Sequence, residues 1–270
     1  MTTFIKRTIS AVVFVAVVLG AALFGPWAFA LVFAAITAIC LMEFYHMVNK
    51  SGAQVLMAWA VPVGVAMFAW AALRSMQLLP GGTAYAVIPA MGLTFVMELF
   101  RAKEQPLHNI GLTLLGWLYV VAPMALLCFM VNTPDGYTHK YLISTLLLVW
   151  SNDTGAYLLG MAVGRHKMFP RISPKKSWEG FAGGLATTAL VAVALWRIFG
   201  GELPQWLMLG AVVGVFGVLG DLVESMFKRA VGVKDSGSLM PGHGGLLDRF
   251  DALLLAAPMA FVYLKLMSII

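Results

Sequence analysis

Residues 205–229 read QWLMLGAVVGVFGVLGDLVESMFKR, and this stretch indicates the fold class. A membrane-spanning helix needs about 20 predominantly apolar residues. Residues 205–227 meet that requirement, and their only charged side chains are Asp221 and Glu224. The stretch therefore predicts a transmembrane helix that carries two carboxylates.

The composition of the whole chain agrees with a membrane protein. Of 270 residues, 61% are hydrophobic and 11% are charged. A soluble domain carries roughly 25% charged residues, so this chain has too little polar surface to cover a globule in water. Its apolar character excludes intrinsic disorder, and two cysteines are too few for a disulfide-stabilised scaffold. Cys40 and Cys128 lie in apolar runs, where we expect small buried hydrophobic residues.

The same length criterion predicts an all-α, polytopic integral membrane protein with about nine transmembrane helices. These are residues 8–24, 27–48, 55–73, 83–100, 110–131, 140–164, 178–199, 205–227 and 251–268. The first is interpreted as an uncleaved span rather than a signal peptide. Residues 1–135 then form an N-terminal part with about five spans, and residues 136–270 a catalytic part with about four.

The distribution of Lys and Arg predicts a cytoplasmic N-terminus. With that orientation, 14 of the 18 basic residues lie on the cytoplasmic side. Such a basic face suits anionic lipid headgroups or nucleotide phosphates, although a topology signal alone would also explain it.

Several carboxylates fall inside or at the edges of the predicted spans. They are Glu43, Glu98, Asp153, Glu179, Asp221, Glu224 and Asp251. A charge at the middle of a membrane helix costs about 2.5–3.5 kcal/mol on insertion scales, so this set predicts a polar cavity, a bound cation or paired bases. Glu43 and Glu98 lie near cytoplasmic helix ends, and for each of them a structural role is the favoured interpretation.

Asp221 and Glu224 are three residues apart, so on a helix they share one face. Ser225 follows, and Lys228 and Arg229 end the helix, where cations are favoured by the helix dipole. This order of groups is typical of a site for a metal-bound phosphate compound. A simple ion pair between Glu224 and Lys228 is the alternative.

The connection after this helix is rich in glycine. Residues 241–245 read PGHGG, and their backbone amides can approach an anion closely. Asp248 and Asp251 then open the last span at spacing i,i+3. Carboxylates beside phosphates are how proteins hold Mg²⁺, which takes only one or two protein ligands.

A second polar region lies between the sixth and seventh spans. Residues 151–153 read SND inside an apolar span, and residues 165–177 form a basic loop. Ser177 and Glu179 are expected to begin the next helix and to hold Lys175 and Lys176 against its amide end as a second anion site.

Residues 225–251, SMFKRAVGVKDSGSLMPGHGGLLDRFD, resemble the signature of the phosphatidate cytidylyltransferase family, the CDP-diacylglycerol synthases. The segments SNDTGAY (151–157), SPKKSWEG (173–180) and GDLVES (220–225) are also similar to recurring segments of that family. The resemblance covers about residues 140–268.

The resemblance implies transfer of the cytidylyl group of CTP to phosphatidic acid, giving CDP-diacylglycerol and pyrophosphate with Mg²⁺ as cofactor. It also implies a multi-pass protein of a bacterial inner (plasma) membrane with its active site facing the cytoplasm. The implied partners are CTP, phosphatidic acid and membrane lipids, with no nucleic acid. A second cation such as K⁺ and a homodimer stay open. The alternatives are a cation-coupled membrane transporter and a related lipid nucleotidyltransferase with another acceptor.

Residue roles follow position by position from the same resemblance. The catalytic candidates are Asp221, Lys228, Arg229, His243 and Asp248. The metal candidates are Asp221 and Asp248, then Asp251 and Glu224. The substrate-binding candidates are Ser151, Asn152, Asp153, Lys175, Lys176, Ser177, Ser225, Lys234, Gly244, Gly245 and Arg249. His243 can be an acid for the leaving group or an anchor of the glycine loop, and both interpretations stand.

Overall fold

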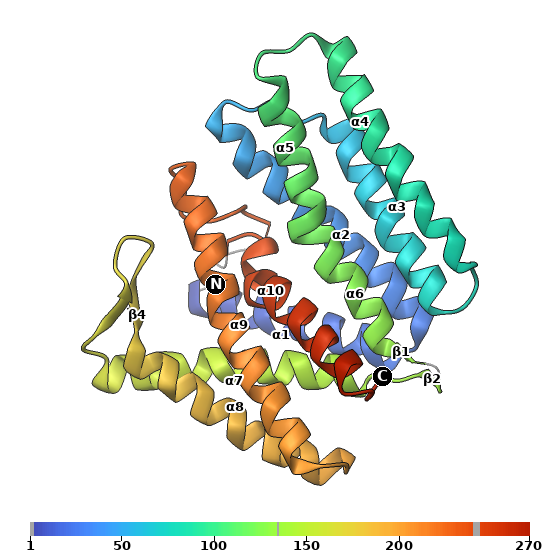
Figure 1. Ribbon diagram of the computed structural model, residues 1–270. Helices are drawn as coiled ribbons and strands as arrows, with labels where there is room; N and C mark the ends of the chain where they lie inside the picture. Colours follow the sequence, from blue (N-terminus) through green and yellow to red (C-terminus); the bar gives the residue numbers. More distant parts are fainter. Residues whose placement is uncertain (1–2, 134, 240–243) are drawn as a thin grey trace. The chain divides into compact units, whose positions relative to one another are not determined.

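The structure is a computed structural model that describes residues 3–133, 135–239 and 244–270. All of its long elements are helices (Figure 1). The chain packs into two compact units. Unit 1 comprises Met1–Tyr137 and Ala230–Arg249, and unit 2 comprises Thr138–Arg229 and Phe250–Ile270.

Unit 1 is built from the N-terminal helices. Its elements are α1 (Thr3–Leu23), α2 (Pro26–Val48), η1 (Asn49–Ser51), α3 (Met57–Ser75), η2 (Gly81–Ala86), α4 (Val87–Arg101), α5 (Pro106–Gly116), η3 (Trp117–Val121), α6 (Ala122–Val131), β1 (Asn132–Thr133) and β2 (Gly136–Tyr137). The π-helical turn η3 joins α5 to α6 in one continuous helical stretch. β1 and β2 pair antiparallel.

Helix α2 lies at the centre of unit 1. It fully buries Phe33, Phe44 and Tyr45, so its position is fixed by packing. The Tyr45 hydroxyl donates a hydrogen bond of 2.8 Å to the carbonyl oxygen of Thr113 in α5. A Cβ at Gly116 would collide with the Tyr45 ring, so α5 approaches α2 closely because this residue is glycine.

A buried polar cluster joins α4 and α5. Asn109 Nδ2 donates to Glu98 Oε1 at 2.6 Å, and Arg101 Nη1 donates to Glu98 Oε2 at 2.6 Å. Asn109 Oδ1 in turn accepts from the backbone N–H of Gln54 at 2.7 Å. Both oxygens of Glu98 are satisfied inside the fold, which supports the structural role predicted for it.

Unit 2 carries the C-terminal helices and one β-hairpin. Its elements are α7 (Lys140–Val163), β3 (Lys167–Phe169), β4 (Ser173–Ser177), α8 (Trp178–Phe199), α9 (Leu203–Ala230) and α10 (Leu247–Leu266), of which the last residue of α9 and the first three of α10 belong to unit 1. β3 and β4 pair antiparallel, with Lys167 opposite Ser177.

Small residues set the packing of unit 2. A Cβ at Gly155 of α7 would lie 2.8 Å from the Gly183 carbonyl oxygen of α8, and one at Gly180 would lie 2.8 Å from the Ala156 carbonyl oxygen. Helices α7 and α8 therefore run side by side at backbone contact (Figure 1). Likewise, Gly220 brings α9 against the backbone of α10 at Asp251.

Each predicted span coincides with a helical segment of the structure, and six of the described helical segments are long and apolar enough to cross a membrane. These are Pro26–Ser51, Met57–Ser75, Gly81–Arg101, Pro106–Val131, Trp178–Phe199 and Leu203–Ala230. The protein is therefore a nearly all-helical membrane protein. The total of nine spans and the cytoplasmic side of the N-terminus stay predictions.

One expectation about the fold was wrong. The basic connection at residues 165–177 contains the hairpin β3–β4 instead of being a loop throughout. Antiparallel pairing satisfies backbone N–H and C=O groups that a loop would leave to water. The hairpin ends where Trp178 N–H donates to the His166 carbonyl oxygen at 2.9 Å, directly at the start of α8.

Candidate active site

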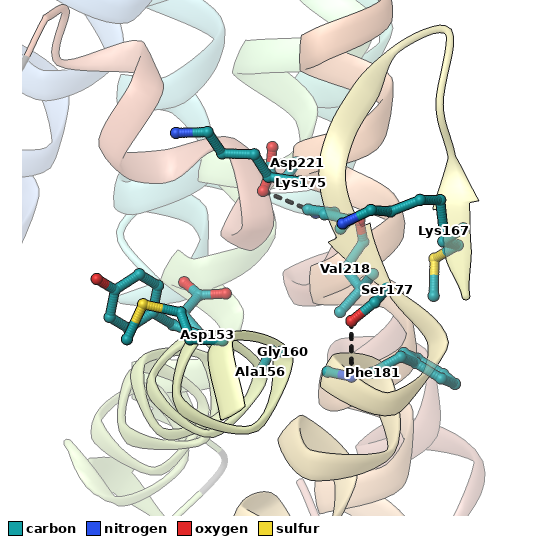
Figure 2. Close-up of a pocket in the computed structure, with 14 residues that line it drawn as sticks. Asp153, Ala156, Gly160, Lys167, Lys175, Ser177, Phe181, Val218 and Asp221 are labelled. Atoms are coloured by element: carbon teal, nitrogen blue, oxygen red, sulfur yellow. Dashed lines mark hydrogen bonds and ion pairs between the residues drawn. The ribbon is translucent and has the colours of Figure 1, made fainter. Parts of the chain in front are cut away.

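A cavity of about 590 Å³ lies inside unit 2, bounded by α7, the β3–β4 hairpin, the start of α8 and α9. Its charged lining residues are Asp153, Lys167, Lys175, Lys176 and Asp221. Its apolar lining includes Met161, Met168, Phe181 and Val218. Figure 2 shows Asp153 on α7, Ser177 and Phe181 at the start of α8, and Val218 and Asp221 on α9. The cavity therefore combines acidic, basic and apolar walls.

The best-defined contact in the cavity joins β4 to α9. Lys176 Nζ lies 2.7 Å from Asp221 Oδ2 and donates to the Val218 carbonyl oxygen at 3.2 Å. Asp221 Oδ1 accepts from the Ser225 hydroxyl at 3.2 Å, one helical turn further along α9. Both side chains of the ion pair remain partly exposed, at 23% for Lys176 and 34% for Asp221. A phosphate or a cation entering the cavity can therefore reach either charge.

Ser177 positions the lysines by ending the hairpin and starting α8. Its side chain accepts from the Gly180 N–H at 3.1 Å and caps the helix, as serine commonly does. The residue before it, Lys176, then points to Asp221, and Lys175 is an exposed lining residue. The capping bond therefore fixes the end of β4, the strand that carries Lys175 and Lys176.

Glu224 and Asp251 are two further carboxylates of unit 2 that lie near Asp221 but do not line the cavity. Glu224 is fully buried and pairs with Lys228 at 2.5 Å, so the i,i+4 ion pair considered from the sequence does form. Asp251 lies near enough to Asp221, Glu224 and Asp153 for each of their negative charges to repel its carboxylate. Four neighbouring carboxylates favour a cation among them.

These carboxylates are not gathered at full coordination distance. Within residues 3–133, 135–239 and 244–270, no group of three or more His, Cys, Asp and Glu side chains could hold a metal ion by itself. Mg²⁺ keeps several waters and is commonly bound by one or two carboxylates together with substrate phosphates. These carboxylates therefore fit Mg²⁺ delivered with a phosphate compound, and they do not resemble a closed structural metal site.

The polar set at residues 151–153 separates into different environments. Asp153 is exposed in the cavity. Asn152 is fully buried against Gly184 of α8, and neither polar atom of its side chain has a hydrogen-bond partner among the described residues. The Ser151 hydroxyl donates to the Leu148 carbonyl oxygen at 2.9 Å. The structure thus brings Asp153 to the cavity and places Asn152 in the helix packing.

The glycine-rich segment belongs to unit 1, where Asp248 organises it. Asp248 Oδ2 accepts from the Gly245 N–H at 2.8 Å and from the Ser236 N–H at 3.1 Å. Gly244 has a left-handed backbone (φ 83°), and a Cβ there would lie 2.7 Å from Asp248 Oδ2. The predicted metal ligand is therefore also the shared acceptor for the backbone amides of Ser236 and Gly245.

Sequence reasoning did not include Glu43, which contacts the residues around Asp248, among the site candidates. Glu43 of α2 accepts from the Leu247 N–H at 2.8 Å through Oε2, and the Ser236 hydroxyl lies 3.5 Å from the same oxygen. A carboxylate inside an apolar span was the only signal in the sequence, and it did not identify the partner.

The remaining candidates are basic side chains and the histidine. Arg229, Lys234 and Arg249 are exposed. His243 lies outside the described residues. The described candidates divide between the two units. Unit 2 carries Ser151, Asn152, Asp153, Lys175, Lys176, Ser177, Asp221, Glu224, Ser225, Lys228, Arg229 and Asp251, and unit 1 carries Lys234, Gly244, Gly245, Asp248 and Arg249.

Together these features define a class of helical membrane protein with a mixed-charge cavity suited to phosphate compounds. Comparison with known proteins identifies the family: a model of the Cytidylyltransferase family matches residues 5–267, so the chain belongs to that family. The match covers nearly the whole chain, so the N-terminal helices belong to the family as well as the charged C-terminal half.

Curated relatives share close similarity over part of their length. A protein of Staphylococcus aureus (strain COL) named phosphatidate cytidylyltransferase is 48% identical over 126 residues, which are 46% of this chain and 48% of that protein. A protein of Staphylococcus haemolyticus (strain JCSC1435) with the same name is 45% identical over 138 residues, 50% of this chain and 52% of that protein. The chain thus spans about half the length of the curated relatives it matches.

Proposed function

We propose that this protein is a phosphatidate cytidylyltransferase that transfers the cytidylyl group of CTP to phosphatidic acid and depends on Mg²⁺. The family match and the name of the curated relatives support this activity. The observation that carries it is the pair formed by Lys176 and Asp221 in a cavity that also exposes Lys175 and Asp153. Lysines bind phosphates, and carboxylates beside them bind the accompanying metal.

The reaction needs positioning more than proton transfer. A phosphate oxygen of phosphatidic acid attacks the α-phosphorus of CTP, a new P–O–P bond forms, and the bond to the β-phosphate breaks to release pyrophosphate. The attacking oxygen is already anionic, so no general base is required. Lys175 and Lys176 would hold the phosphates in line and neutralise the negative charge that accumulates.

Asp221 and Asp248, with Asp251 and Glu224 as further candidates, are the residues we propose to hold Mg²⁺. Mg²⁺ held by these carboxylates would supply positive charge that offsets the negative charge of the phosphates during transfer. Asp221 is oriented for this role by Ser225 and Lys176. Lys176 would then exchange its contact with Asp221 for one with substrate phosphate.

The apolar part of the cavity supports a lipid substrate. Met161, Met168 and Phe181 lie in the same lining as Lys175 and Lys176. A phosphatidic acid headgroup could place its phosphate at the lysines and its glycerol backbone against the apolar side chains.

The location of the enzyme follows from the same proposal. We propose that the cavity opens to the cytoplasm of a bacterial cell, where CTP is available and where most Lys and Arg residues are predicted to lie. Phospholipid substrate would arrive within the membrane. A homodimer is part of the proposal by family likeness alone.

The direct test is to incubate detergent-purified protein with labelled CTP, Mg²⁺ and phosphatidic acid. We expect labelled CDP-diacylglycerol and pyrophosphate in equal amounts, and no product when EDTA removes the metal. Diacylglycerol is the matched control, because it has the same acyl chains and lacks the phosphate. Product with a polyprenyl phosphate but none with phosphatidic acid would reject the proposed acceptor.

We expect Lys176→Met to lower kcat/KM for phosphatidic acid by about 10²-fold, because it removes a charge that meets the substrate phosphate. Methionine keeps most of the apolar stem, so β4 should stay in place. Initial rates at varied phosphatidic acid measure the effect. Lys103→Met, an exposed lysine after α4, is the control and should keep wild-type rates; equal rates in both variants would remove Lys176 from the mechanism.

A further inference from the structure

The start of α10 contacts a side chain that lies 204 residues away in the sequence. Glu43 Oε2 accepts from the Leu247 N–H at 2.8 Å. Leu247 is the first residue of α10, so its N–H is one of the amides at the helix start that have no partner within the helix. A carboxylate at this position also favours the positive end of the helix dipole.

Two glycines make room for the Glu43 carboxylate. A Cβ at Gly237 would collide with Glu43 Oε1, and a Cβ at Gly245 would lie 2.5 Å from Glu43 Oε2. Glu43 itself is only 9% exposed, and its neighbours Phe44 and Tyr45 are fully buried. Gly237 and Gly245 therefore pack directly against the Glu43 carboxylate, and the buried neighbours of Glu43 fix its place on α2.

Glu43 and Asp248 both accept hydrogen bonds from Ser236, and each accepts one from a backbone amide near the start of α10. Ser236 directs its hydroxyl to Glu43 and its N–H to Asp248, at 3.5 and 3.1 Å. The Gly245 N–H donates to Asp248, and the Leu247 N–H donates to Glu43. Moving Glu43 would thus move the amides that orient Asp248.

We propose that Glu43 is a positioning residue for the active site, which sets the place of Asp248 by anchoring Ser236 and Leu247. This inference rests on the proposed function, in which Asp248 is a metal ligand. Partners that orient a metal ligand typically contribute 10–100-fold to metal affinity or activity, so the effect is large enough to measure. Glu43 does not need to touch substrate or metal.

Three variants separate positioning from general stability. Glu43→Ala removes the acceptor for Leu247, whereas Glu43→Gln keeps an oxygen that can accept the same hydrogen bond. Glu98→Ala is the matched control: Glu98 is 5% exposed and lies in the same unit, but its partners are Asn109 and Arg101. Each protein is purified whole, and its thermal unfolding midpoint is measured first.

The first measurement is amide hydrogen exchange of the peptide covering residues 236–249 in metal-free protein. Loss of a hydrogen bond to a charged acceptor should speed exchange in Glu43→Ala by roughly tenfold or more, while Glu43→Gln stays near wild type. Glu98→Ala should leave this peptide unchanged even if the protein is less stable overall. This measurement does not depend on any activity.

The second measurement is the Mg²⁺ concentration for half-maximal formation of CDP-diacylglycerol. We expect it to rise roughly 10-fold or more in Glu43→Ala, to be largely restored in Glu43→Gln, and to stay at the wild-type value in Glu98→Ala. Wild-type exchange and wild-type Mg²⁺ dependence in Glu43→Ala would overturn the inference, as would equal shifts in Glu43→Ala and Glu98→Ala. An inactive wild-type protein would reject the proposed function, and the exchange measurement would still decide whether Glu43 holds the loop.

Discussion

Replacing Asp221 with Asn is expected to reduce cytidylyl transfer by at least about 10³-fold at saturating Mg²⁺, because an amide oxygen carries no charge to bind the metal or to balance Lys176. Asp221 lies in the cavity and pairs with Lys176 at 2.7 Å. Partly exposed ion pairs contribute little to stability, so the variant should insert and fold normally. Initial rates and the thermal unfolding midpoint measure the two effects separately.

Asp248→Asn is the companion variant, and we expect the same loss of transfer. Its side-chain oxygen can still accept from Gly245, so the loop should stay folded. The control is Asp135→Asn, an exposed aspartate in the connection between β1 and β2, which should keep the wild-type rate. Near wild-type turnover of Asp221→Asn or of Asp248→Asn at saturating Mg²⁺ would show that the aspartate replaced does not bind the metal.

The sequence was sufficient to predict the helices because the physical cause is local. A run of apolar residues such as 205–227 can satisfy its backbone only as a helix when it lies in a membrane. The β3–β4 hairpin was missed because a short, charged segment carries almost no hydrophobic periodicity. Its strands depend on pairing Lys167 with Ser177 across a turn, which composition does not reveal.

The candidate site could be predicted in residue type but only partly in contact. The helical spacing put Asp221 and Glu224 on one face and left a Glu224–Lys228 ion pair as an alternative; the structure has that ion pair and also a hydrogen bond from Ser225 to Asp221. The spacing could not show that Lys176 reaches Asp221, since that contact depends on how β4 meets α9. Glu43 is the extreme case, because its partner Leu247 lies in another part of the chain.

Asn152 shows a different limit of sequence reasoning. A polar triplet inside an apolar span indicates a site, but a helix turns successive side chains by about 100°, so adjacent residues face different surroundings. Asp153 faces the cavity, whereas Asn152 is buried against the glycine of α8. Only the neighbouring helices determine which of the two is accessible.

Replacing Gly220 with Ala is expected to lower both stability and activity, because α9 packs against α10 at this residue. A Cβ at Gly220 would lie 2.6 Å from the Asp251 carbonyl oxygen and 3.1 Å from the Ala252 Cα. Backbone atoms cannot rotate away, so in Gly220→Ala the two helices must separate. We expect a loss of about 1–3 kcal/mol in stability, as for other overpacked cores. Asp251 would also move relative to Asp221. A misplacement of about 1 Å in an active site can lower activity by about 10²-fold.

The control for this variant is Gly92→Ala in α4. Gly92 also lies inside a helix, but a Cβ there would meet no atom within 4 Å. Alanine favours helix by up to about 1 kcal/mol over glycine, so Gly92→Ala should unfold at or slightly above the wild-type temperature and keep full activity. Thermal unfolding and product formation are measured on both purified variants. If Gly220→Ala behaves like Gly92→Ala in both measurements, α9 and α10 do not meet at backbone contact, and the place of Asp251 relative to Asp221 does not depend on that approach.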